Sequence, residues 1–277
     1  MRAGRSLTAL VLAGLMGGPA GAGDRPARVV STNLCTDQLA MLVAGAGQLH
    51  SVSYLAADPR SSSMPEAAAA YPLNHGRAEE IYLMRPDLVL SGGFATRATT
   101  DMLRRLGIRV VVFQPASSLD DVRDRLTRMG EVLGREDRAA ELVAAFDARL
   151  AALRATDGDR PSAALYAANG YTSGDGSLAG QILAAAGFDN IADEAGYPNG
   201  GAMPLEVLAM ARPDAIVASR PYPGRSRAES VLDHPALAAI GAARGHIDAD
   251  WSCGTPHVLD AVAEMRALRR GIGDDAP

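Results

Sequence analysis

The chain carries nearly the same segment twice, more than a hundred residues apart. EEIYLMRPDLVLS begins at Glu79, and EVLAMARPDAIVAS begins at Glu206. In each copy a glutamate lies seven residues before a proline, which ends a short helix because proline lacks the N–H that would continue it. An apolar run typical of a buried strand follows. The repeat predicts two similar lobes or, in the simpler interpretation, two ordinary helix-to-strand junctions of one α/β protein.

Apolar runs and helical patterns alternate along most of the chain, with 48% hydrophobic residues to supply a core. This alternation predicts an α/β fold with mostly parallel sheets and helices on both faces. Residues 135–154 have apolar side chains at helical spacing and predict a helix about 30 Å long between the two halves. Strands are expected at residues 28–31, 51–54, 87–91, 109–113, 162–167, 214–219 and 246–249.

Several helix ends are marked by capping residues. Thr36-Asp37 is expected to cap a helix over residues 38–44. Ser118 with Asp121 three residues later has the pattern of a capping box. Gly187 is expected to end a helix, because glycine readily takes the left-handed conformation found there.

The first residues have the pattern of a secretory signal peptide. Arg2 and Arg5 precede an apolar run from Leu7 to Met16, and Ala20-Gly21-Ala22 resembles a cleavage site. We expect residues 1–22 to be removed and the mature protein to be exported, to the periplasm in a Gram-negative source. The alternative, a membrane anchor, needs a longer apolar run, because the hydrocarbon layer is about 30 Å thick.

The charge of the chain argues against one class of partner. The net charge is −5, and basic residues do not gather in any one stretch. A nucleic-acid-binding face requires a basic patch or stripe. No nucleic-acid partner is therefore expected.

Taken in order, these segments resemble those of substrate-binding proteins that serve ABC importers of cobalamin, ferric siderophores and haem. The resemblance covers nearly the whole mature chain and is carried by RVVSTNLCTDQLAMLVAGAG, AEEIYLMRPDLVLSGG, YTSGDGSLAGQILAAAGFDNIADE and PLEVLAMARPDAIV. It implies an α/β fold of two Rossmann-like lobes joined by a single long helix, with the ligand cleft between them. The implied boundaries are an N-terminal lobe at residues 23–134, a linking helix at 135–156 and a C-terminal lobe at 157–277.

The resemblance also implies a function. It describes a periplasmic binding protein, not an enzyme, that captures a metal chelate and delivers it to an ABC permease dimer in the inner membrane. The chelate is a ferric siderophore, cobalamin or haem, carried without any covalent cofactor, and the protein is expected to be a monomer. Glu79 and Glu206 are implied to pair with arginines of the permease, one from each lobe.

Loops that follow the strands should line the cleft. Trp251 offers a flat ring for a corrin or porphyrin face, although tryptophan is also common in cores. Tyr171 and Tyr197 can donate hydrogen bonds or bind haem iron, and Arg77 can pair with an anionic chelate. The full set of expected ligand-binding residues is Asn33, Cys35, His75, Arg77, Phe94, Tyr171, Tyr197, Trp251 and Cys253.

The two cysteines, Cys35 and Cys253, leave three interpretations open. They form a disulfide across the cleft, they are two separate buried thiols, or they are soft ligands of a metal together with His75 or His257.

Two other functions compete with the importer. A free transition-metal-ion binding protein of similar architecture would need about three histidines and a carboxylate, and the five histidines are scattered. A cysteine-dependent enzyme would use Cys35 as nucleophile, with His75 or His257 as its base.

Overall fold

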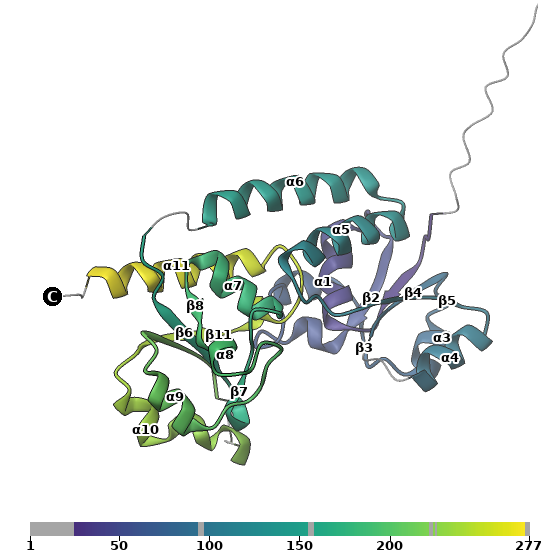
Figure 1. Ribbon diagram of the computed structural model, residues 1–277. Helices are drawn as coiled ribbons and strands as arrows, with labels where there is room; N and C mark the ends of the chain where they lie inside the picture. Colours follow the sequence, from purple (N-terminus) through teal and green to yellow (C-terminus); the bar gives the residue numbers. More distant parts are fainter. Residues whose placement is uncertain (1–24, 94–96, 155–157, 222–223, 225, 275–277) are drawn as a thin grey trace, which may run out of the picture.

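The computed structural model describes residues 25–274 apart from 94–96, 155–157, 222–223 and 225, and it contains two separate parallel sheets (Figure 1). The expected signal peptide and Phe94 lie outside the described residues. In the first sheet the strand order is β3-β2-β1-β4-β5, and in the second it is β11-β10-β6-β8. The strands of the first sheet are β1 (Val29–Ser31), β2 (Leu49–Ser53), β3 (Leu73–Asn74), β4 (Leu88–Gly92) and β5 (Arg109–Phe113).

The second sheet belongs to the other half of the chain. Its strands are β6 (Ser162–Tyr166), β8 (Asp189–Asn190), β10 (Ala215–Ser219) and β11 (Ala243–Ile247). A short antiparallel pair, β7 (Tyr171–Thr172) with β9 (Gly201–Ala202), lies beside it. The expected α/β fold with two lobes is confirmed, because each half of the chain builds its own parallel sheet.

Helices cover both faces of each sheet because successive strand residues point to opposite sides. In β1, Val29 packs in the main core with α1 (Leu34–Val43) and α5 (Leu119–Leu133). Its neighbour Val30 packs in an outer cluster with Ile81 of α3 (Ala78–Leu83) and Leu103 of α4 (Arg97–Arg105).

The second sheet is built in the same way. Its inner face packs against α7 (Leu178–Ala186) and α11 (Val258–Asp274). Its outer face packs against α8 (Ile191–Glu194), α9 (Leu205–Ala211) and α10 (Pro235–Ala239). Helix α2 (Pro65–Ala68) is a single turn in the first lobe.

The long helix α6 (Glu136–Leu153) runs along the side of the molecule where the two halves adjoin (Figure 1). It packs on α5 of the first half and on α11 of the second, and it buries Phe146 and Leu150 in the main core. Its bounds lie within the expected linking helix at 135–156. The exact division of the chain into lobes stays a prediction.

The repeated segment builds the same corner in both lobes. Arg85 and Arg212 end their short helices at φ 49° and 45°, in the left-handed region, just before the proline. The next aspartate then caps the neighbouring strand. Asp87 accepts hydrogen bonds from the N–H groups of residues 27 and 28, and Asp214 accepts from the N–H and hydroxyl of Ser162. The residues that the two copies share therefore form the same helix-to-strand connection in both lobes, in addition to placing the two glutamates.

Most expected elements lie within a few residues of those observed, with clear differences at the start of one helix and at one strand. Helix α1 begins at Leu34 and not near residue 38, because Asn33 and not Thr36-Asp37 is its N-cap. Strand β11 spans Ala243–Ile247 and not residues 246–249, because it pairs along its whole length with β10. The capping box of Ser118 and Asp121 is confirmed, as is the left-handed Gly187.

None of the helices in the described part of the chain combines the length and the apolar character that crossing a membrane requires.

Candidate functional site

The loops that follow strands of the two sheets meet at a seam between the lobes, and a disulfide joins them there. Cys35 lies in the first turn of α1, directly after β1, and Cys253 follows a short helical turn after β11. The two Cα atoms are 5.1 Å apart and the sulfur atoms are bonded. Of the three interpretations of the cysteines, the disulfide is correct. In this form neither sulfur is a free thiolate, so the pair does not provide soft metal ligands or a nucleophile.

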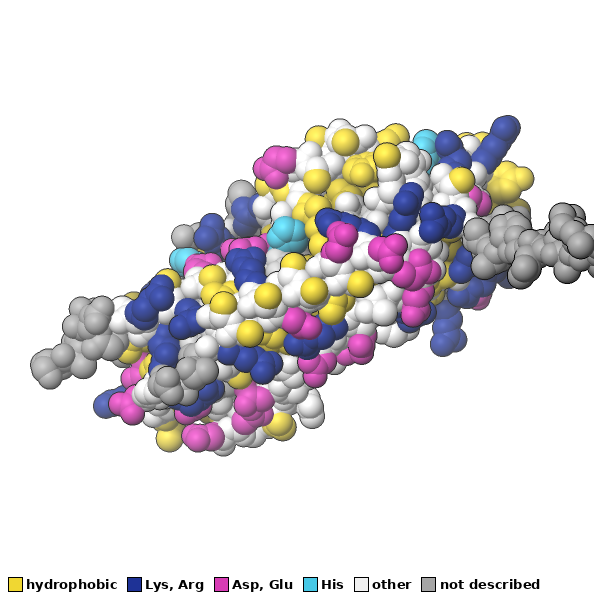
Figure 2. All heavy atoms as spheres, turned by 90° about the horizontal axis from the view of Figure 1, so that it is seen from above, with side chains coloured by type: hydrophobic (Ala, Val, Ile, Leu, Met, Phe, Trp, Pro, Cys, Tyr) yellow, Lys and Arg dark blue, Asp and Glu magenta, His cyan; other side chains and the backbone are white. Residues whose placement is uncertain are grey.

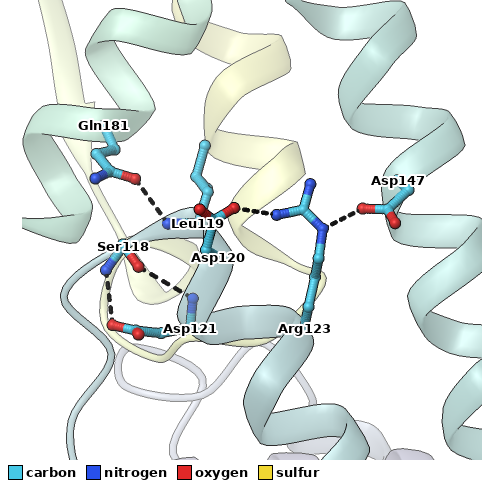
Figure 3. A network of polar contacts seen from close by, with 7 residues as sticks. All are labelled: Ser118, Leu119, Asp120, Asp121, Arg123, Asp147 and Gln181. Atoms are coloured by element: carbon cyan, nitrogen blue, oxygen red, sulfur yellow. Dashed lines mark hydrogen bonds and ion pairs between the residues drawn. The ribbon is translucent and has the colours of Figure 1, made fainter.

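Further polar contacts cross the seam. A guanidinium nitrogen of Arg60 donates to the backbone oxygen of Pro221 at 2.8 Å. On the α6 side, the backbone N–H of Leu119 donates to the side-chain oxygen of Gln181 at 2.8 Å, so the start of α5 is tied to α7 (Figure 3). Sequence reasoning did not find these contacts, because nothing local marks a side chain as reaching the other lobe.

His75 and Tyr54 form the clearest aromatic group of the first lobe. Their ring centroids are 5.3 Å apart with nearly parallel planes, and Tyr54 is half exposed. The backbone N–H of His75 donates to Glu80 at 2.8 Å, and its ring nitrogen lies 3.3 Å from the same carboxylate. Although burial alone would raise it, these hydrogen bonds lower the pKa of Glu80. Glu80 is thus a carboxylate that holds the exposed imidazole in place.

Tyr54 is a further candidate for the site that sequence reasoning missed. The sequence predicts it as the last residue of a strand at residues 51–54, whereas β2 ends at Ser53 and Tyr54 begins a helical turn. Its place directly after a strand is the signal that could have found it. Arg77 is exposed at the start of α3, and its contact with a ligand stays a prediction.

Asn33 has a structural task. Its side-chain oxygen accepts the N–H groups of Cys35 and Thr36 and so caps α1. A side chain at Gly92 would stand 2.6 Å from the Asn33 amide carbon, so glycine is needed at the end of β4. Asn33 therefore fixes the turn that carries Cys35, and contact with a ligand stays a prediction.

Tyr171 and Tyr197 lie together at the β7–β9 corner of the second lobe. Tyr171 is half exposed, and its hydroxyl passes 2.9 Å from where a side chain would begin at Gly200. Gly200 also has φ +88°, a backbone conformation that L side chains rarely adopt. Tyr197 is partly buried against the outer core of that lobe. Tyr171 is thus the more accessible of the two rings.

Trp251 is placed differently from the expectation. Only 5% of it is exposed, and its ring packs in the main core. A large apolar ring stabilises the fold most when it is buried, and here it lies close in sequence to the disulfide. The expectation that this ring offers a free face to a flat ligand is corrected: Trp251 has a core role in this arrangement.

Asp250, the residue before Trp251, lies near two other carboxylates, Asp248 and Asp260. Burial is the main cause that raises the pKa of its carboxyl, and Asp248 and Asp260 raise it further. Donor atoms of Asp250, His257 and Asp260 lie within 4.8 Å of one another, the one group of this kind among the described residues. Asp260 already pairs with Arg149 at 2.6 Å. This group holds one histidine, fewer than the roughly three that the free-metal alternative is expected to use.

Glu79 and Glu206 are exposed, each in the first turn of its short helix, α3 or α9. The charge of Glu206 also affects the buried Tyr166 of the same lobe. Burial and, after it, this charge raise the pKa of Tyr166. Both acids are therefore placed on rigid elements where a partner can reach them.

Comparison with known proteins agrees with this architecture. The family model described as periplasmic binding protein matches residues 29–246. A cobalamin-binding protein of Halobacterium salinarum is 28% identical over 202 residues, which are 70% of this chain and 54% of that protein. The chain thus spans about half the length of the curated relatives it matches.

Solved structures show the same fold at low sequence identity. The periplasmic haem-binding protein HutB of Vibrio cholerae superposes with a TM-score of 0.72 at 19% identity, over 87% of this chain and 98% of that one. An ABC-type Fe3+-hydroxamate transport protein of Saccharomonospora viridis gives a TM-score of 0.63 at 24% identity, over 88% of this chain and 93% of that one. With a family model that matches most of its length and this two-lobed fold, the chain belongs to the periplasmic binding protein family.

Proposed function

We propose that this protein is the periplasmic substrate-binding component of an ABC importer and that its ligand is a metal chelate, namely a ferric siderophore, cobalamin or haem. The observation that carries the proposal is the seam itself, where loops at the carboxyl ends of two parallel sheets face each other across Cys35 and Cys253. Such sheet edges are where open α/β folds bind ligands. Relatives named for cobalamin, haem and ferric hydroxamate support the ligand class.

The ligand contacts we propose come from both lobes. Tyr54 and His75 supply stacked rings from the first lobe, and Arg77 supplies a cation nearby in sequence. Tyr171 supplies an exposed phenol from the second lobe. A ring system with acidic substituents would be held by stacking and by charge-assisted hydrogen bonds.

We extend the proposal to the location of the protein, to its membrane partner and to a role without catalysis. We propose export through the N-terminal segment and docking of Glu79 and Glu206 on a permease dimer of the inner membrane. Binding and release are the whole of the activity. The cysteine-dependent enzyme lacks its nucleophile while Cys35 stays in the disulfide.

A ligand titration tests this function. Haem, cyanocobalamin and a ferric hydroxamate are titrated separately into the oxidised protein, with Trp251 fluorescence and calorimetry as readouts. We expect one of the three to bind with a Kd of about 1 µM or tighter, which corresponds to about −8 kcal/mol. The double variant Tyr54→Ala/His75→Ala should weaken that binding at least about tenfold, since two stacked rings are lost.

The matched control is Glu136→Gln, an exposed change at the start of α6 that should leave ligand binding unchanged. Heat signals and fluorescence that stay flat for all three chelates would refute the proposed function.

A further inference from the structure

An apolar groove lies beside Glu79 on the first lobe. It has a volume of about 270 Å³ and lies between α3 and α4. Four of its side chains are large, apolar and strongly exposed, and Leu83 is the most exposed of them at 79%. Its lining residues are Ala78, Glu79, Tyr82, Leu83, Met102 and Leu106.

The groove is held open by buried neighbours. Ile81 of α3 and Leu103 of α4 are fully buried or nearly so and fix the two helices against the sheet. The exposed residues next to them in sequence must then point outward. Single exposed apolar residues are ordinary on protein surfaces, but a contiguous group on a rigid scaffold marks an interaction site.

The second lobe repeats the combination of charge and apolar side chain. Glu206 is followed four residues later by Met210, as Glu79 is followed by Leu83. Residues four apart on a helix lie on the same face. Met210 is 83% exposed, and Leu208 between the two is fully buried and anchors α9. Each lobe therefore presents a carboxylate and a large apolar side chain side by side.

Both surfaces lie on the same side of the molecule. In Figure 1, α3 with α4 and α9 with α10 form the lower corners, and α6 lies along the opposite, upper side. On the α6 side, acidic, basic and hydrophobic side chains are interspersed (Figure 2). A partner that approached from below would meet two similar footprints at once.

We propose that each lobe docks through a glutamate and an apolar residue together, Glu79 with Leu83 and Glu206 with Met210, and that the α3–α4 groove receives an apolar side chain of the partner. The partner is the membrane permease dimer, whose two equivalent halves each offer a basic residue beside an apolar one. This inference rests on the proposed function.

Physical chemistry favours the combination over the glutamates alone. An ion pair that stays exposed contributes little to binding, since water and salt screen it. An apolar contact beside the pair excludes water and also contributes its own burial. Two such footprints give a permease dimer both register and affinity.

The test measures binding to permease dimers in nanodiscs by biolayer interferometry. Three purified dimers serve as probes, from a cobalamin, a haem and a ferric hydroxamate importer. Leu83→Ser and Met210→Ser should each weaken binding to the recognised dimer about tenfold, comparable with the loss of one well-buried apolar side chain. Glu79→Gln and Glu206→Gln should also weaken it, with a loss that shrinks at high salt.

Two control variants are matched to these changes. Leu73→Ser alters an exposed leucine outside both footprints, and Glu136→Gln alters an exposed first-turn acid on the α6 side. Both should bind the permease like the wild type. Circular dichroism melts check that each variant is folded, as expected for side chains with so much exposed surface.

Each outcome decides a separate question. If the glutamate variants lose affinity and the two serine variants do not, the inference fails and the proposed function stands. If the wild-type protein dimerises in light scattering and Leu83→Ser abolishes the dimer, the groove belongs to a second copy and the inference is wrong. If the wild type binds a chelate but none of the three dimers, the inference fails together with the proposed permease partner, whereas chelate binding itself stands.

Discussion

Asp37 is a buried carboxylate in the first turn of α1, close to the disulfide. The hydroxyl of Ser53 donates to one of its oxygens at 2.5 Å, and the other oxygen has no hydrogen-bond partner within the described residues. Burial raises its pKa to about 6, against the opposing effect of the nearby hydroxyls of Ser31 and Ser53. A carboxyl that is protonated more readily when folded makes stability depend on pH in the range between its unfolded and folded pKa values, from 3.8 to about 6.

The sign of this dependence follows from the two pKa values. In the unfolded chain the pKa of Asp37 is 3.8, so between the two values the folded state binds the proton more tightly. The stabilisation is present at low pH and is lost as the pH rises through about 6, by up to about 3 kcal/mol. Asp37→Asn should therefore gain stability relative to the wild type between pH 4.5 and 7.5. Urea unfolding at both pH values measures this, and a difference between the two proteins that is constant with pH would refute it.

At the scale of elements, the start of α5 is where three parts of the molecule are joined. Ser118 and Asp121 form the capping box, Gln181 of α7 accepts the N–H of Leu119, and Arg123 pairs with Asp147 of α6 (Figure 3). The first turn of one helix thereby contacts the linking helix and the second lobe. The conformation of this first turn of α5 therefore affects the relative position of the two lobes as well as the stability of the helix.

Loss of this cap should be measurable. Ser118→Ala removes the hydroxyl that accepts the N–H of Asp121 and should lower the free energy of unfolding by about 1 kcal/mol. Ser118→Thr keeps the hydroxyl and should restore most of the loss. The measurement is urea denaturation followed by circular dichroism. Equal stability of the alanine and threonine variants would contradict a capping role.

At the scale of the whole molecule, the two lobes are tied on both sides of their seam. α6 packs along one side, and the disulfide of Cys35 and Cys253 closes the seam across 218 residues of sequence. One rigid helix and one covalent bond leave less room for hinge opening than a flexible linker would. We therefore expect only small changes in the relative position of the lobes in the oxidised protein.

The disulfide should also contribute a large part of the stability. A cross-link that closes a loop of 218 residues restricts the unfolded chain by about 5 kcal/mol in the chain-entropy model. Cys35→Ser/Cys253→Ser should lower the free energy of unfolding by up to that amount and remain folded, because Arg60–Pro221 and Leu119–Gln181 still hold the seam.

The control for this change is reduction itself. A phosphine reductant should destabilise the wild type by a similar amount and leave the double serine variant unaffected. Urea midpoints monitored by Trp251 fluorescence provide the comparison. A wild-type midpoint that does not move on reduction would show that the bond contributes nothing.

Local signals determined most of the elements of this protein and the repeat that organises it. The alternation of apolar runs predicted strands such as β5, and Ser118 and Gly187 marked helix ends, because these features depend on neighbours a few residues away. The repeat placed Glu79 and Glu206 on equivalent short helices. The resemblance to a family then predicted two lobes.

Only the tertiary structure decided which residues meet. Cys35 and Cys253 were compatible with three kinds of chemistry, and the approach of two loops 218 residues apart selected the disulfide. Trp251 proved to be part of the core, and Tyr54 rather than a predicted residue stacks on His75. Sequence fixes local backbone preference, whereas burial and contact depend on the packing of distant segments, which no local pattern encodes.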